Sequence, residues 1–319
     1  METGSSRASS AQSIVLPLVK LFFIGESLGG FVELPFFMLV CYDMSMTLLD
    51  GKKIAERMLA ELKEEIAAMK ENLRLAVVVV GQDPVIDNFI AQKKKAGESV
   101  GVDVRVYPFP ADITTNELRR RIAEIVHEKK NTGVIIQLPL PAHINRQYIL
   151  NAIPPEKDPD VLSSRAVGNF AVGKSPVMPP VVGAIKILFQ EYGIEYQGRK
   201  IVVLGAGALV GRPVALWLAG EHATFTLVGS EKHDPKEFLA DADIVIAGIG
   251  KQKFVTARMI KKGVVLIDAG TSESEGRIAG DIDADSVGDR ASHLAPVPGG
   301  VGPLTVAVLF KNLVTLSKL

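Results

Sequence analysis

Apolar residues along this chain follow two periodicities that alternate in blocks. From residue 50 to about residue 70 they recur at every fourth position with lysine and glutamate between them, which predicts an amphipathic helix. Leu75–Val80 is a continuous apolar, β-branched run, which predicts a strand buried on both faces. The pattern then predicts a helix over 89–100, a strand over 102–109, a helix over 115–130 and a strand over 134–138.

A second alternation begins after Pro179-Pro180. It predicts a helix over 181–192, a second helix that runs from a glycine turn to about residue 219, and a third over 303–317. It predicts strands over 200–204, 224–228, 244–247 and 264–268. Such alternation is typical of parallel sheets with crossover helices. We therefore expect an α/β protein of two domains, an N-terminal α/β catalytic domain and a C-terminal Rossmann-type nucleotide-binding domain. The expected boundaries are 46–180 and 181–302, and 303–319 is expected to be a C-terminal helix that packs back on the first domain.

Residues 1–45 lie outside this alternation, although the stretch over 14–42 is apolar enough to suggest a membrane span. Lys20, Glu26 and Glu33 interrupt it, and its longest uncharged run, Leu34–Tyr42, has nine residues, whereas a spanning helix needs about 20 apolar residues. A signal peptide also fits poorly, because no small-residue cleavage site follows the stretch. We expect a non-core N-terminal extension, with translation starting at Met44 or Met46 as one explanation; a membrane-associating or targeting segment is the alternative.

Composition narrows the function classes. The chain has 319 residues with 36 basic and 36 acidic side chains, and 47% of its residues are hydrophobic, as in a compact globular protein. A zero net charge argues against a general nucleic-acid binder. A single cysteine excludes a disulfide framework, and the five histidines lack the spacing of a zinc site. We expect a cytoplasmic protein with no nucleic-acid, membrane or metal partner.

A glycine turn over 205–211 follows the strand expected at 200–204 and precedes a helix. Gly205, Ala206, Gly207 and Gly211 give the spacing G-x-G-x-x-x-G, one residue longer than the common dinucleotide fingerprint. Glycine lets the backbone approach a pyrophosphate, and a helix N-terminus offers N–H groups to the anion. The turn therefore predicts a nucleotide site; a tight turn without a ligand is the alternative.

Glu231 lies 20 residues beyond Gly211, at the end of the next expected strand. A carboxylate at this place would accept a hydrogen bond from a ribose 2′-OH and repel a 2′-phosphate, which favours NAD over NADP. The alternative is a solvated loop charge next to Lys232.

Six further motifs occur in one order along the chain. They are Gly81-Gln82-Asp83-Pro84, Lys93-Lys94-Lys95, Gln137-Leu138-Pro139-Leu140-Pro141, the segment 155–160 (PEKDPD), the segment 280–283 (GDID) and the segment 296–305 (PVPGGVGPLT). From about residue 46 to the C-terminus the chain resembles the bifunctional methylenetetrahydrofolate dehydrogenase/methenyltetrahydrofolate cyclohydrolase family.

The resemblance implies an activity and a set of site residues. It implies oxidation of 5,10-methylenetetrahydrofolate with NAD(P) and hydrolysis of the product to 10-formyltetrahydrofolate, in one-carbon metabolism and purine biosynthesis, by a homodimer. Lys93 and Gln137 match the catalytic lysine and glutamine, and Asp160 matches the aspartate that binds the pterin ring. The remaining matches border the substrate (Phe89, Gly299, Gly300) or the cofactor (Gly205, Ala206, Gly207, Gly211, Ser230, Glu231, Thr271).

The chain departs from the family pattern at several of these places. Phe89 stands where the family has tyrosine, so a monofunctional dehydrogenase is a second interpretation. Ile86 replaces a serine, and Asp158-Pro159-Asp160-Val161 replaces D-V-D-G. Gly205-Ala206-Gly207 replaces a G-R-S turn whose arginine and serine hold the NADP 2′-phosphate, which leaves NADP or NAD open. A non-catalytic regulator that binds nucleotide or folate is a third interpretation.

Overall fold

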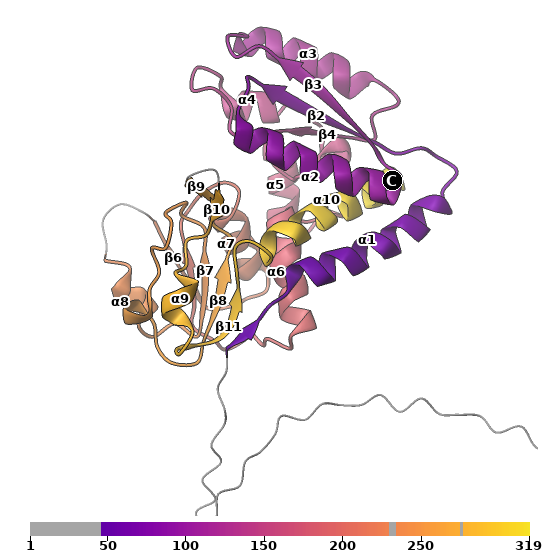
Figure 1. Cartoon of the computed structure of the whole chain (residues 1–319). Coiled ribbons are helices and arrows are strands. Elements are labelled where there is room, and N and C mark those ends of the chain that lie inside the picture. The colour runs from indigo at the N-terminus through magenta and orange to yellow at the C-terminus, as the bar shows by residue number, and fades with distance from the viewer. Residues whose placement is uncertain (1–45, 230–233, 275–276) are drawn as a thin grey trace, which may run out of the picture. The chain divides into compact units, whose positions relative to one another are not determined.

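The computed structural model describes residues 46–229, 234–274 and 277–319. The expectations for residues 1–45, Ser230 and Glu231 therefore lie outside the described residues. Ser45–Leu319 forms one compact unit, in which two lobes each contain a parallel sheet (Figure 1). Among the described residues, no helix has both the length and the apolar content that crossing a membrane requires.

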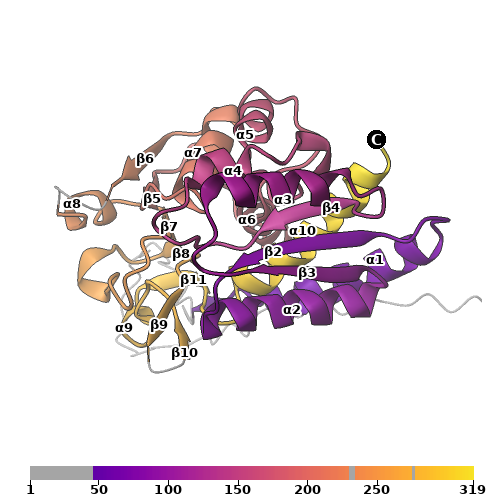
Figure 2. The ribbon, with the colours of Figure 1, turned by 90° about the horizontal axis from the view of Figure 1, so that it is seen from above.

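The first lobe has a three-stranded parallel sheet with the order β3-β2-β4. Its elements are β2 (Arg74–Val80), α2 (Pro84–Val100), β3 (Asp103–Phe109), α3 (Thr115–His127), β4 (Gly133–Ile136) and α4 (Arg146–Leu150). Alternate residues of β2 point to opposite faces, so Leu75 and Val77 join the core with α2 while Ala76 and Val78 join the core with α3. Figure 2 shows α2 and α3 on the two faces of this sheet. The expectation that this strand is buried on both faces is confirmed.

Helix α1 (Gly51–Ala67) begins where the sequence pattern places it. The Asp50 side chain caps it, because Oδ1 accepts a hydrogen bond from the Lys53 N–H at 2.9 Å. Ile54, Leu62 and Ile66 form its buried stripe. The helix therefore presents lysine and glutamate to solvent and its apolar face to the core.

The second lobe has a six-stranded parallel sheet with the order β1-β11-β8-β7-β5-β6. The strands are β1 (Thr47–Leu48), β5 (Ile201–Leu204), β6 (Phe225–Val228), β7 (Ile244–Ala247), β8 (Val264–Asp268) and β11 (Ala291–Ala295). The helices are α6 (Pro180–Glu191), α7 (Gly211–Gly220), α8 (Lys236–Leu239) and α9 (Ala284–Val287), and a β9 (Ser272–Ser274)–β10 (Arg277–Ala279) hairpin follows β8. The expected Rossmann-type alternation is confirmed.

Two strands of this sheet lack a sequence signal. Strand β1 has two residues, and β11 carries Ser292 and His293 in its middle. Thr47 and Leu48 precede the expected first domain's helix, yet they pair with His293 and Leu294 in the second lobe. The described part of the chain therefore begins in the second lobe and passes to the first lobe through α1.

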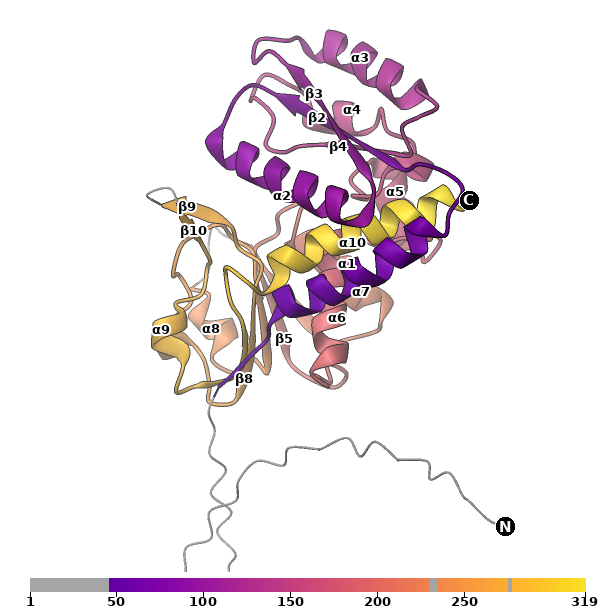
Figure 3. The same cartoon turned by 45° about the vertical axis from the view of Figure 1, so that its right-hand side comes forward.

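Helix α10 (Val301–Ser317) belongs to both lobes. Its first half supplies Val301, Leu304 and Ala307 to the core around α6, and its second half supplies Phe310 and Leu313 to the core around β2 and α2. Figure 3 shows α10 beside α1 between the two sheets. The two lobes thus share one helix, which contributes to the cores of both.

Candidate functional site

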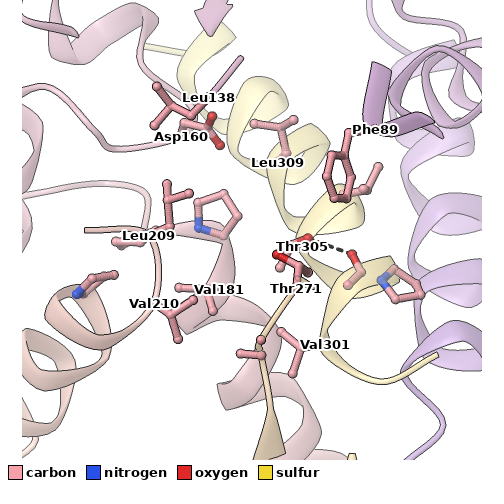
Figure 4. Close-up of a pocket in the computed structure, with 18 of the residues that line it drawn as sticks. Phe89, Leu138, Asp160, Val181, Leu209, Val210, Thr271, Val301, Thr305 and Leu309 are labelled. Atoms are coloured by element: carbon pink, nitrogen blue, oxygen red, sulfur yellow. Dashed lines mark hydrogen bonds between the residues drawn. The ribbon is translucent and has the colours of Figure 1, made fainter. Parts of the chain in front are cut away.

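A pocket of about 790 Å³ lies between the two lobes. Helix α2 and the loop after β4 line it from the first lobe; the start of α7 and the loops after β8 and β11 line it from the second. Figure 4 shows Asp160 and Leu138 on one side, Phe89 on another, and Leu209 and Val210 on the nucleotide-turn side. The pocket therefore brings together residues that the sequence singled out in separate motifs.

The side chains of Lys93 and Gln137 lie next to each other in the pocket. Lys93 Nζ donates a hydrogen bond to Gln137 Oε1 at 3.1 Å, and Gln137 Nε2 donates to the Leu138 carbonyl at 3.0 Å. The second bond fixes the amide so that its oxygen faces the lysine. Burial lowers the pKa of Lys93, which favours the neutral amine, although the charge of Asp160 acts in the opposite direction.

Phe89 lies one helical turn before Lys93 on α2. Lys93 Nζ is 6.0 Å from the centre of the Phe89 ring, so both side chains share the face of α2 that lines the pocket. The ring is half-buried and offers a flat apolar surface. An aromatic ring beside polar groups is suited to stacking against a planar heterocycle.

Asp160 faces the same region from the loop before α5 (Ser164–Ala171). Burial raises the pKa of Asp160 to about 6; the Lys93 charge lowers it and the Asp158 charge adds to the increase. The carboxylate is thus ionised at neutral pH and ready to accept hydrogen bonds from a ligand. Its charge also balances a cation at Lys93.

The loop that carries Asp160 is held by Asp158. Asp158 is buried, and its Oδ2 accepts hydrogen bonds from the N–H groups of Leu162 at 3.1 Å and Ser163 at 2.8 Å. Val161 has φ +56°, a left-handed conformation that is costly for a β-branched residue. Sequence reasoning noted that this loop is altered but did not predict that Asp158 organises it, because both aspartates look alike in sequence.

Gly299 and Gly300 form a tight turn between β11 and α10. Gly299 has φ +107°, and a Cβ added at Gly300 would lie 2.6 Å from the Pro296 carbonyl oxygen. A Cβ added at Gly51 would lie 1.9 Å from the Gly300 oxygen, so the start of α1 packs directly on this turn. The expectation of a turn with unusual dihedral angles is confirmed: a side chain would clash at Gly51 and Gly300, and the positive φ disfavours one at Gly299.

The glycine turn over 205–211 reaches the pocket through its middle residues: Ala208, Leu209 and Val210 line the pocket, whereas Gly205, Ala206, Gly207 and Gly211 do not. Gly205 has φ +100°, and a Cβ at Gly211 would lie 1.7 Å from the Gly205 oxygen, which explains two of the three glycines. Gly207 faces open space. No backbone N–H from residue 206 to 211 donates to another residue in the described part of the chain. A row of free N–H groups beside an open glycine suits a pyrophosphate.

The start of α7 differs from the sequence expectation in one detail. The helix begins at Gly211; the Arg212 N–H already donates to the Gly207 carbonyl at 3.0 Å, and Pro213 has no N–H. The turn therefore supplies most of the free N–H groups, and the helix supplies few. Arg212 Nε donates to the Ala206 carbonyl at 3.1 Å, so a guanidinium lies beside the turn although position 206 is alanine.

Asp268 and Thr271 line the pocket from the loop after β8. Asp268 is buried and accepts hydrogen bonds from the N–H groups of Gly270, Asp281 and Ile282. Asp281 is also buried and accepts from the N–H groups over 249–251. Burial raises the pKa of Asp268 to about 6. Asp281 belongs to the 280–283 motif, which sequence reasoning recognised, but Asp268 carried no sequence signal beyond its place at a strand end.

Comparisons with known proteins match both lobes of the chain. Residues 49–160 match the family model "Tetrahydrofolate dehydrogenase/cyclohydrolase, catalytic domain", and residues 179–319 match its "NAD(P)-binding domain". The chain is 39% identical over 279 residues to the "Bifunctional protein FolD" of Moorella thermoacetica, a match that covers 86% of this chain and 100% of the relative.

Two solved structures extend the comparison. One is the bifunctional enzyme FolD, methylenetetrahydrofolate dehydrogenase/cyclohydrolase, from Campylobacter jejuni, with 35% identity, a TM-score of 0.82 and coverage of 86% of this chain and 99% of that one. The other is the Trypanosoma brucei enzyme complexed with NADP and an inhibitor, with 33% identity, a TM-score of 0.82 and coverage of 86% and 98%.

Proposed function

The chain belongs to the tetrahydrofolate dehydrogenase/cyclohydrolase family, and from that premise we propose that it oxidises 5,10-methylenetetrahydrofolate with NAD(P) and hydrolyses the methenyl product to 10-formyltetrahydrofolate. One observation carries the proposal: Lys93, Gln137 and Asp160 line the same pocket as residues 208–210 of the glycine turn. One wall suits a pterin and its hydrolysis, and the opposite wall suits a dinucleotide.

The second lobe positions the dinucleotide. The free N–H groups over 206–211 would hold its pyrophosphate, and Thr271 and the 299–300 turn would border its nicotinamide end. When bound, NAD(P) supplies the hydride acceptor. The protein would align the two partners between the lobes, and α10 packs in the cores of both.

The first lobe binds and hydrolyses the folate. The Asp160 carboxylate would accept two N–H groups from a 2-amino-4-oxo ring, and the Phe89 ring would stack beside it. Lys93, with a pKa lowered by burial, would take a proton from the water that attacks the methenyl carbon. Gln137 Oε1 would keep the lysine nitrogen in place through the 3.1 Å hydrogen bond.

One assay tests this function directly. Purified protein is given 5,10-methylenetetrahydrofolate with NAD and with NADP side by side, and reduced cofactor is recorded. We expect turnover with at least one of them. Measurable cofactor binding with no turnover would instead support the non-catalytic regulator.

The same assay decides the cofactor. Ala206 in place of an arginine favours NAD, since a bound 2′-phosphate would lose charge-assisted hydrogen bonds worth roughly 1.5–3 kcal/mol each. The Arg212 guanidinium beside the Ala206 carbonyl favours NADP, as does the NADP bound to the similar Trypanosoma brucei enzyme. We propose NAD as the preferred cofactor; a preference for NADP by more than tenfold would contradict the role assigned to Ala206 and Glu231.

Phe89 offers a test of the hydrolysis step. A Phe89→Tyr variant is expected to raise the rate of methenyltetrahydrofolate hydrolysis several-fold, because the added hydroxyl would lie on the same helix face as Lys93. Hydrolysis is followed by the loss of methenyl absorbance against the buffer rate. If wild-type protein is no faster than buffer, the protein is a monofunctional dehydrogenase; if the variant gains nothing, the missing hydroxyl does not limit the rate.

We also propose a homodimer in the cytoplasm that supplies formyl groups to purine biosynthesis. Strand β6 supports the dimer, since it is an edge strand with Thr226 and Leu227 exposed. Light scattering is expected to give twice the mass of the 34.2 kDa chain, or twice that of a chain without residues 1–45. A Leu227→Lys variant would shift the mass to that of a monomer, and an unchanged mass would place the interface elsewhere.

A further inference from the structure

Helix α10 contains one buried polar residue among its buried apolar ones. Asn312 is 4% exposed, and the other buried residues of this fully described helix are apolar. Its amide nitrogen donates two hydrogen bonds, one to the Pro159 carbonyl at 2.8 Å and one to the Met178 carbonyl at 2.8 Å. Because an amide nitrogen carries two hydrogens, both donors are used and the side chain has a fixed orientation.

The two carbonyls lie directly before two segments that line the pocket. Pro159 precedes Asp160, the carboxylate that we propose binds the pterin. Met178 precedes Pro179 and Pro180, which line the pocket at the start of α6. One buried amide therefore connects the pterin-binding loop of the first lobe to the segment that leads into the second lobe.

The loop around Asp160 has a support on each side. After this residue, the N–H groups over 162–163 donate to the buried Asp158 carboxylate. Before it, the support is the hydrogen bond from Asn312. Between the two supports Val161 has φ +56°, and a β-branched residue keeps such a conformation only where the surrounding structure enforces it.

A second buried asparagine provides a comparison. Asn131 lies in the first lobe, and its amide nitrogen donates to the Ile125 carbonyl near the end of α3 at 2.8 Å. Neither asparagine lines the pocket. The two side chains make the same kind of hydrogen bond, and they differ in that Asn131 holds the end of a helix whereas Asn312 holds the loop that carries Asp160.

We propose that Asn312 is a positioning residue for folate binding, which places the Asp160 carboxylate by holding the Pro159 carbonyl. The inference rests on the proposed function and adds a residue that does not line the pocket itself. Charge-assisted hydrogen bonds depend on geometry, so a small displacement of the carboxylate should weaken folate binding about tenfold.

The test compares Asn312→Leu with Asn131→Leu as the matched control. Both changes remove a buried amide that donates to backbone carbonyls, so both should lower the melting temperature. At a temperature where both variants are folded, we measure the Kd of 5-formyltetrahydrofolate without cofactor, and kcat and KM with 5,10-methylenetetrahydrofolate and NAD(P). We expect Asn312→Leu to raise the Kd and KM for folate about tenfold and to change kcat and the KM for NAD(P) less than about twofold. Asn131→Leu should leave all four constants at the wild-type values.

A double-mutant cycle shows whether the effect passes through Asp160. In the Asp160→Asn background, Asn312→Leu should raise the Kd of 5-formyltetrahydrofolate less than about twofold, because the carboxylate that Asn312 places is absent. A general loss of structure would raise the Kd by the same factor in both backgrounds. Asn312→Ser keeps one hydroxyl donor and is measured as well, in case Asn312→Leu does not fold, with an expected increase of about threefold.

Four results would overturn the positioning role. They are equal effects of Asn312→Leu and Asn131→Leu on folate binding, an equal increase in the KM for NAD(P), the same factor in both Asp160 backgrounds, and wild-type folate affinity in Asn312→Ser. If wild-type protein neither binds nor oxidises the folate, the proposed function fails and the positioning role with it. If wild-type protein does both and the Asn312 variants bind folate equally well, only the positioning role fails.

Discussion

Lys93→Met is expected to lower the rate of methenyltetrahydrofolate hydrolysis by about 10²–10⁴-fold, the usual contribution of a positioned acid–base group. The methionine keeps the length of the side chain and its packing on α2, but it cannot accept a proton from water or donate to Gln137 Oε1. Oxidation of methylenetetrahydrofolate needs no such proton transfer. We therefore expect hydride transfer to lose much less, so the ratio of the two activities should change.

The control for this variant is Lys94→Met. Lys94 is the next residue on α2, is exposed and does not line the pocket, so the change should leave both activities as they are. Stopped-flow measurement of methenyl formation and decay gives both rates in one experiment. An equal loss of the two activities in Lys93→Met would show that the lysine acts in folate binding and not in hydrolysis.

Asp160→Asn is expected to have the second largest effect, and it should change activity and stability in opposite directions. Loss of charge-assisted hydrogen bonds to the pterin should lower kcat/KM of both reactions by roughly 10²-fold or more. Burial raises the pKa of Asp160 from 3.8 to about 6, so ionisation of this carboxyl destabilises the folded state as the pH rises from 4 to 6. At pH 7 the neutral amide should therefore stabilise the protein by up to about 3 kcal/mol.

The pH profile of wild type follows from the same pKa. The ionised carboxylate binds the pterin, so kcat/KM should fall about tenfold for each pH unit below about 6, and Asp160→Asn should remove this dependence. Glu156→Gln, an exposed carboxyl change in the same segment, is the control and should keep the wild-type profile. A wild-type profile that stays flat down to pH 4.5, or an unchanged profile in Asp160→Asn, would contradict the assigned role.

Long elements with a strong period could be predicted from the sequence. Helix α1 and strand β2 begin and end within a few residues of their expected limits, because the i+4 stripe and the β-branched run each specify one structure. Strand β11 could not be predicted, since Ser292 and His293 break the apolar run that marks the other strands. Its position is decided by neighbours β8 and β1, which are distant in the chain.

The residues of the candidate site also differ in whether the sequence alone could predict them. Lys93 and Gln137 belong to motifs that sequence comparison recognises, and the structure places their side chains 3.1 Å apart. Nothing local in the sequence shows that Asp158 holds the loop while Asp160 faces the pocket. These assignments depend on burial and on contacts between distant segments, which a linear pattern does not contain.

Helix α10 has a consequence for the order in which the protein is synthesised and folded. The groove between α1, α2 and the first sheet is filled by Phe310 and Leu313, which follow every strand of the second lobe in the chain. A ribosome makes these residues after the second lobe, so the first lobe keeps an open apolar groove while the second lobe is translated. Because contacts between distant residues form slowly and exposed apolar surface promotes aggregation, the nascent chain should depend on chaperones until helix α10 emerges.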